Sequence, residues 1–248
     1  MVDGLDQIDW SNLHHAFGSA ADVPGLLRAV AGTDRIASEG ALSELFGTVW
    51  HQGTVYEASA YAVPFLARIA RQAPLSQSDR SMIVALLGGI AGGWSYIEVH
   101  RRSLPEAFGA MDEVNRAREM SHVAAARAAV GREAPALFAD LGNQDDRTDW
   151  RLSALAAQVS EFALSASPIV ERLKGQTDNP SLRAALDLTS AMIAGVATSN
   201  VVSAAAAALG PQELALANER TSLSPERRAR IVADCLYEDG FDEAQVGG

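Results

Sequence analysis

The chain of 248 residues has little cysteine, lysine or aromatic content. Cys235 is the only cysteine, which excludes an internal disulfide and a thiolate cage around a metal. Lys174 is the only lysine, and aromatic residues make up 6% of the chain. No apolar run reaches the ~18–20 residues of a membrane span, because arginines interrupt each one. The first nine residues are acidic and show no signal-peptide pattern. We therefore expect a cytoplasmic protein with no membrane association.

Positive charge is also scarce: 31 acidic residues against 20 lysines and arginines give a formal net charge of −11. The 48% of apolar residues is too high for a disordered chain. A surface of this charge repels phosphates, so nucleic acid is not expected as a partner. It favours a basic protein or peptide instead.

Apolar residues recur with helical spacing almost everywhere, and no segment alternates as a strand should. The predicted helices lie near residues 34–50, 54–72, 79–91, 104–130, 147–164, 180–197 and 225–236. In the second of these, Thr54 and Glu57 have the spacing of a capping box. Pro64 inside the same helix predicts a kink, because it removes one backbone hydrogen bond.

The chain also contains a weak internal repeat. Three prolines are each followed ten residues later by an aspartate, giving the pairs Pro24 and Asp34, Pro135 and Asp145, and Pro168 and Asp178. Each aspartate precedes a longer apolar segment, and Pro64 begins a fourth, less regular copy. The predicted unit is a short helix, a turn capped by aspartate, and a second helix, repeated every 33–44 residues or so.

This pattern resembles the HEAT and armadillo class of α-solenoids, in which an arginine often follows the turn in the second helix. The arginines that match this position approximately are Arg35, Arg80, either Arg147 or Arg151, and Arg183. Residues 51–66 also resemble uncharacterised HEAT-repeat-like proteins of high-GC bacteria. The resemblance implies an all-α fold, an α-α superhelix of about five or six helix pairs. It implies one domain over residues 1–248, with an N-terminal cap over 1–20, repeats over 21–200 and C-terminal capping helices over 201–248.

Two connections between predicted helices, residues 50–57 and 94–102, combine tryptophan, tyrosine, histidine and glutamate. Adjacent connections of a solenoid can meet on one surface, where a histidine beside a glutamate could bind a ligand or transfer protons. The alternative is structural: His51 caps a helix C-terminus and the aromatic side chains fill the gap between repeats. The candidate ligand- or partner-binding residues are Trp50, His51, Tyr56, Glu57, Tyr61, Trp94, Tyr96, Glu98, His100 and Arg101.

Motifs for catalysis and metal binding are absent from the sequence. It has no glycine-rich phosphate loop, no G-x-S-x-G and no H-E-x-x-H. The adjacent His14 and His15 would point about 100° apart on a helix, so they cannot share one metal. No metal or cofactor is expected, and Cys235 is expected to be a small buried side chain.

These observations predict a scaffold or adaptor that binds another protein on stacked helices. A concrete version is an immunity-type protein that masks a basic effector such as a nuclease toxin. The alternative is a protein that binds or modifies a small molecule, like a lyase or cyclase, with a pocket at His51, Tyr96 and His100. Whether the chain is an enzyme stays open at this point.

Overall fold

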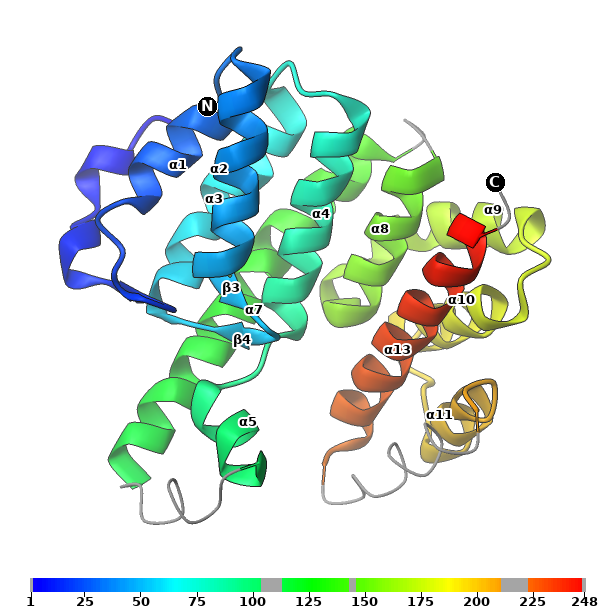
Figure 1. The fold of residues 1–248 in the computed structure, drawn as a ribbon. Coiled ribbons are helices and arrows are strands. Elements are labelled where there is room, and N and C mark those ends of the chain that lie inside the picture. Colours follow the sequence, from blue (N-terminus) through cyan, green and yellow to red (C-terminus); the bar gives the residue numbers. More distant parts are fainter. Residues whose placement is uncertain (1, 104–112, 143–145, 211–222, 247–248) are drawn as a thin grey trace. The chain divides into compact units, whose positions relative to one another are not determined.

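The computed structural model describes residues 2–103, 113–142, 146–210 and 223–246, and its regular structure is almost entirely helical (Figure 1). The all-α prediction is therefore confirmed. The chain forms two compact units, unit 1 (Met1–Glu133) and unit 2 (Ala134–Gly248). The boundary between them falls within one long helix, α7 (Glu113–Leu141). A single solenoid domain over the whole chain stays a prediction.

Unit 1 begins with two short 3-10 helices and a small hairpin, and the rest is mainly helical (Figure 1). Its elements before α7 are η1 (Leu5–Gln7), η2 (Trp10–Asn12), β1 (His14–His15), β2 (Gly18–Ser19), α1 (Val23–Val30), α2 (Arg35–Thr48), β3 (Trp50–His51), β4 (Thr54–Val55), α3 (Glu57–Gln72), α4 (Gln77–Gly92) and α5 (Tyr96–Ser103). Helix α1 packs on α2, and α3 packs on α4.

Helix α3 forms the centre of the unit 1 core, as its apolar spacing predicted. Ala58, Ala62, Phe65, Leu66 and Ile69 are all buried. Alanine along this face lets neighbouring helices approach closely. Tyr61, predicted on the same face, is instead 45% exposed. The helix is continuous through Pro64.

Unit 2 consists of helices joined by short connections (Figure 1). After the end of α7 its elements are α8 (Asp146–Gln158), η3 (Ser160–Phe162), η4 (Leu164–Ala166), α9 (Ser167–Gln176), α10 (Pro180–Ile193), α11 (Ser199–Ala206) and α13 (Pro225–Val246). Helix α10 packs against α8, α9, α11 and α13, and therefore forms the centre of this unit.

The helix starts test the predicted caps one by one. Asp34 caps α2 as predicted, because its carboxylate accepts from the backbone N–H groups of Ile36 and Ala37. Asn179 caps α10 by accepting from the N–H of Leu182. The cap predicted at Asp178 is therefore wrong, whereas the sequence Asn179–Pro180, a capping residue before a proline at the first helical position, correctly predicts this start.

Two further predicted starts differ in the structure. Thr54 lies before α3 in strand β4, so the capping box with Glu57 does not form. Ser59 takes that role, since its hydroxyl accepts from the N–H of Tyr56 at 2.8 Å and donates to the carbonyl of Val49. Pro135 lies inside α7 and begins no helix, and Asp145 lies outside the described residues.

In each of two helix pairs, an arginine of the second helix contacts the end of the first helix. Arg80 of α4 donates from its guanidinium to the carbonyls of Ala70 and Ala73 at the end of α3. Arg183 of α10 donates in the same way to the carbonyl of Thr177 at the end of α9. Both arginines are the fourth residue of the second helix. In contrast, Arg35 is the first residue of α2 and pairs with Glu39.

The two hairpins are the main departure from the predicted secondary structure. Strand β1 pairs with β2, and β3 pairs with β4, both antiparallel. His14 and His15 therefore belong to a strand, where successive side chains point to opposite faces.

Among the residues that the structure describes, no helix combines the length and the apolar character that a membrane span requires.

Candidate functional site

The β3–β4 hairpin positions the first candidate segment in front of helix α3. Its two-residue turn consists of Gln52 and Gly53, with φ of 49° and 84°. Positive φ at both positions is the geometry of a tight hairpin turn, and glycine adopts it without steric cost. His51 therefore lies in a strand. The structural alternative, in which His51 caps a helix C-terminus, is wrong.

The second candidate segment meets this hairpin through its backbone. The N–H of Trp94 donates to the carbonyl of Gly53 at 2.8 Å, and the N–H of Val55 donates to the carbonyl of Trp94 at 3.0 Å. Gly93 permits this approach, because a Cβ there would lie 2.4 Å from Cγ1 of Val55. The hairpin and the start of α5 thus form one connected piece of structure.

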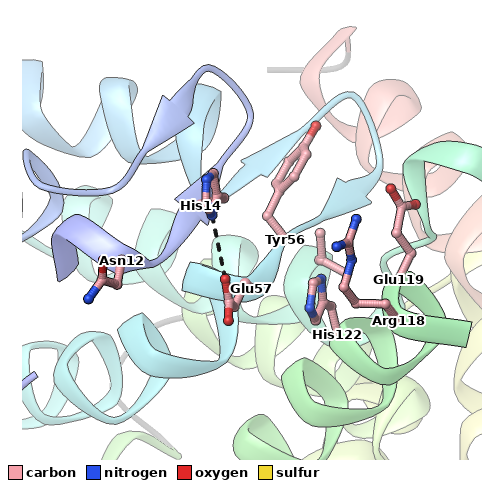
Figure 2. Close-up of a pocket in the computed structure, with 8 residues that line it drawn as sticks. Asn12, His14, Tyr56, Glu57, Arg118, Glu119 and His122 are labelled. Atoms are coloured by element: carbon pink, nitrogen blue, oxygen red, sulfur yellow. Dashed lines mark ion pairs between the residues drawn. The ribbon is translucent and has the colours of Figure 1, made fainter. Parts of the chain in front are cut away.

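A cavity of about 490 Å³ opens beside this piece, within unit 1 (Figure 2). We call it the polar pocket. Its lining residues are Asn12, His14, Val55, Tyr56, Glu57, Arg118, Glu119 and His122. They come from three separate stretches of the chain: the first hairpin region, the start of α3, and α7. All but Val55 carry a polar group.

One wall of the polar pocket is formed by His14 and Glu57 (Figure 2). Nδ1 of His14 lies 3.7 Å from Oε2 of Glu57, within ion-pair distance but beyond a good hydrogen bond. The His14 side chain is 70% exposed and that of Glu57 37%. Both groups therefore remain accessible to a ligand in the cavity.

Tyr56 stands between the hairpin and the pocket, and its phenol is held in the neutral form. Burial raises its pKa, and the hydrogen bond with Thr54 opposes that effect only in part. The negative charge of Glu119 and the neighbouring Tyr96 phenol raise the pKa further. The Tyr56 hydroxyl lies 2.6 Å from Oγ1 of Thr54, which donates to the carbonyl of His51. Because the hydroxyl proton of Thr54 is already donated to His51, the hydroxyl of Tyr56 donates to Thr54.

The opposite wall is formed by α7, from which Arg118 and His122 project one turn apart (Figure 2). Arg118 is exposed and forms no ion pair with any residue that the structure describes. Glu119 accepts the backbone N–H of Ile97 at 3.0 Å, which ties the start of α5 to α7. This wall therefore combines an available guanidinium, an imidazole and an anchored carboxylate.

Of the ten predicted site residues, the polar pocket includes Tyr56 and Glu57. Trp50 packs edge-on to Phe46 with ring centroids 6.0 Å apart. The ring of His51 lies 5.3 Å from that of Phe17. Neither lines the pocket, so the predicted pairing of His51 with the pocket glutamate is not formed.

The remaining predicted residues are more dispersed. Tyr61 faces Trp10 on the outer side of α3, with centroids 6.5 Å apart. Glu98 lies 3.8 Å from Arg116, and Tyr96 is 39% exposed. Trp94 is half-buried and contributes its backbone to the hairpin contact. The side chains of His100 and Arg101 lie outside those that the structure describes.

Six pocket residues were not among the predicted site residues: Asn12, His14, Val55, Arg118, Glu119 and His122. One signal was available for the α7 group, since Arg118 and His122 are four residues apart on a predicted helix and must share a face. No local pattern indicates that His14 should approach Glu57, because 43 residues separate them in sequence and the contact depends on the tertiary fold.

Nowhere in the described part of the chain do three His, Cys, Asp or Glu side chains gather as possible ligands of one metal ion. Comparisons with protein-family models, with curated proteins and with solved structures found no match to this chain. The assignment of a function therefore depends on the geometry of the pocket.

Proposed function

We propose that this protein binds a small polar molecule in the polar pocket of unit 1. The observation that carries the proposal is convergence: seven polar side chains from three stretches of sequence surround one cavity of about 490 Å³. Small-molecule sites typically occupy about 300–1,000 Å³. Small-molecule binding is also the alternative function predicted from the sequence, with a pocket at His51, Tyr96 and His100. The site proposed here is instead lined by His14, the start of α3 and α7.

The chemistry of the lining favours binding of a charged ligand. Arg118 offers a planar guanidinium, which suits carboxylates and phosphates. Glu57 and Glu119 offer carboxylates, and His14 and His122 offer imidazoles that can donate or accept hydrogen bonds. The His14–Glu57 pair could also transfer a proton, so an enzymatic role for the same pocket is part of the proposal.

The proposed scaffold for this site is a HEAT-like arrangement of helix pairs in the cytoplasm. The shared role of Arg80 and Arg183 supports it, because each joins the second helix of a pair to the end of the first. A superhelix of five or six such pairs remains the proposed architecture. The lone cysteine is in keeping with a reducing compartment.

Thermal unfolding in the presence of a library of polar metabolites tests the proposal. A ligand at 100 times its Kd stabilises the folded state by about 2.7 kcal/mol, which is a readily measured rise in Tm. Arg118→Ala should abolish the rise, whereas Arg132→Ala, an exposed arginine on the same helix outside the pocket, should preserve it. If no library member raises the Tm of the wild-type protein, the proposal is wrong.

A second candidate function follows from the charge. The net charge of −11 favours a basic protein partner, such as an effector masked by an immunity-type protein. The polar pocket itself is nearly charge-balanced and does not select for such a partner. Pull-down from the native host, repeated at rising salt, would recover a basic protein whose association weakens with ionic strength. Recovery of no partner, or of one indifferent to salt, contradicts this candidate.

A further inference from the structure

We infer that the ligand of the polar pocket is zwitterionic, with a carboxylate or phosphate at one end and an ammonium group at the other. This inference rests on the proposed function and specifies the chemistry of that ligand. It derives from the placement of two groups of opposite charge in one cavity, Arg118 on the α7 wall and Glu57 on the wall at the start of α3 (Figure 2).

The anionic end is assigned to the α7 wall. Arg118 and His122 lie one helical turn apart and both line the cavity. Arg118 has no ion-pair partner among the described residues, so its guanidinium can donate two parallel hydrogen bonds to a ligand. A carboxylate or phosphate satisfies this geometry, and the imidazole of His122 supplies a further donor.

The cationic end is assigned to the wall at the start of α3. Oε2 of Glu57 is 3.7 Å from the only protein nitrogen that it pairs with in the described part of the chain, Nδ1 of His14. This separation leaves the carboxylate able to accept from a ligand ammonium. The phenol of Tyr56, kept neutral, also lines the pocket and adds no charge.

The charge balance of the pocket separates a zwitterion from simpler ligands. A polyanion would approach Arg118 but would also face the carboxylates of Glu57 and Glu119. A polyamine would approach the carboxylates but would meet Arg118. Only a ligand with both signs pairs Arg118 and Glu57 each with its opposite charge, because like charges in one cavity oppose binding.

Isothermal titration with matched probes tests the assignment. The probes are the free L-amino acids, each with its N-acetyl and its α-amide form, O-phosphoethanolamine with its N-acetyl form and with ethanolamine, citrate and spermidine. We expect at least one free amino acid or O-phosphoethanolamine to bind at least about tenfold more tightly than its form with a blocked amine or blocked acid, as loss of one charge-assisted contact implies. Whether amino acids or O-phosphoethanolamine bind better identifies the anionic end as carboxylate or phosphate.

Variants then assign each end to its wall. Arg118→Ala should remove the advantage of the free acid while keeping that of the free amine, and Glu57→Gln should do the reverse. Arg132→Ala and Glu39→Gln serve as matched controls outside the pocket, and both should bind like the wild type. Urea unfolding of each variant confirms that the fold is retained.

The outcomes separate the inference from the proposed function. Binding of citrate or spermidine alone, lost in Arg118→Ala or Glu57→Gln, overturns the zwitterion and leaves a small-molecule pocket. Equal affinity for free and blocked forms also overturns it. Binding of no probe, together with no Tm rise in the metabolite library, overturns both.

Discussion

The two units are built from similar helices but use their polar side chains differently. In unit 2 two buried polar side chains, Asp149 and Tyr237, each pair with another polar side chain. Asp149 is 1% exposed and lies 2.6 Å from Nη2 of Arg172, and the hydroxyl of buried Tyr237 lies 3.0 Å from that of Thr189. In unit 1 the polar groups of the pocket converge on a cavity, and the guanidinium of Arg118 has no ion-pair partner within the described residues.

This difference separates structural polar groups from candidate functional ones. A paired, buried group stabilises its fold only while its partner is present, so its removal destabilises the protein. An accessible group in a cavity contributes little to folding and is available to a ligand. Removal of a paired polar group in unit 2 should therefore lower stability, and removal of Arg118 from the pocket of unit 1 should lower binding.

The largest effect is expected for Asp149→Ala in unit 2. It leaves the guanidinium of Arg172 without its buried partner, at a cost of about 3 kcal/mol in the free energy of unfolding. Urea denaturation measures this loss. Asp149→Asn should cost less, because its amide oxygen can still accept from Arg172, which is partly exposed. Ligand binding at the polar pocket should survive in the fraction of the protein that stays folded. A neutral effect of Asp149→Ala would contradict the structural role.

Gly93→Ala should have the next largest effect, and it acts on unit 1. The added Cβ would meet Cγ1 of Val55, which lines the pocket, and overpacking of this kind costs about 1–3 kcal/mol. Both stability and binding should therefore fall. Gly40→Ala is the control: its Cβ meets nothing, and alanine stabilises a helix interior by about 0.5–1 kcal/mol. Equal behaviour of the two variants would show that the hairpin contact with Trp94 does not form.

Tyr237→Phe should cost about 1 kcal/mol at neutral pH, because it removes one buried hydrogen bond. Oγ1 of Thr189 keeps its bond to the carbonyl of Ala185 at 2.7 Å. Burial raises the pKa of Tyr237 above its usual value near 10, and the hydrogen bond with Thr189 opposes this only in part.

The same tyrosine predicts a pH dependence. The neutral phenol favours the folded state, so its contribution is complete below pH 10 and falls as the unfolded chain ionises above that pH. The wild type should then lose up to about 1.4 kcal/mol per pH unit more than Tyr237→Phe. Unfolding curves at pH 9, 10 and 11 measure the two slopes, and parallel slopes would contradict the burial of this phenol.

The smallest effect on stability is expected for Arg118→Ala, within about 0.5 kcal/mol, because the side chain is exposed and forms no ion pair in the described part of the chain. Chemical denaturation measures it. A loss as large as that of Asp149→Ala would make Arg118 a structural residue and would erase the contrast between the units.

Helices and many of their boundaries could be predicted from local patterns. Asp34 and Asn179 act directly on the backbone N–H groups that follow them, and the α3 face follows from a spacing within sixteen residues. The short hairpins could not be predicted in this way. Two-residue strands give no alternation to detect, and Gln52–Gly53 is a weaker turn signal than Asn-Gly.

Of the pocket residues, only Tyr56 and Glu57 were predicted, because they lie within a segment whose residue types already suggested a site. Residues 50–57 and 94 do meet, but through backbone bonds, and most of their aromatic side chains lie outside the pocket. The pocket forms because α7 brings Arg118 and His122 near Tyr56 and Glu57. Such a contact between distant segments depends on packing of the whole unit, which no local spacing encodes.

Histidine side-chain NMR during titration with the amino-acid probes is the most direct test of the polar pocket. The account predicts that the imidazole signals of His14 and His122 shift with ligand concentration. His15 is the internal control, because it is buried, lies outside the pocket and bonds to Asp22 at 3.0 Å, so its signal should stay in place. Shifts of His15 equal to those of His14 and His122, or no shift of either pocket histidine, would contradict the account.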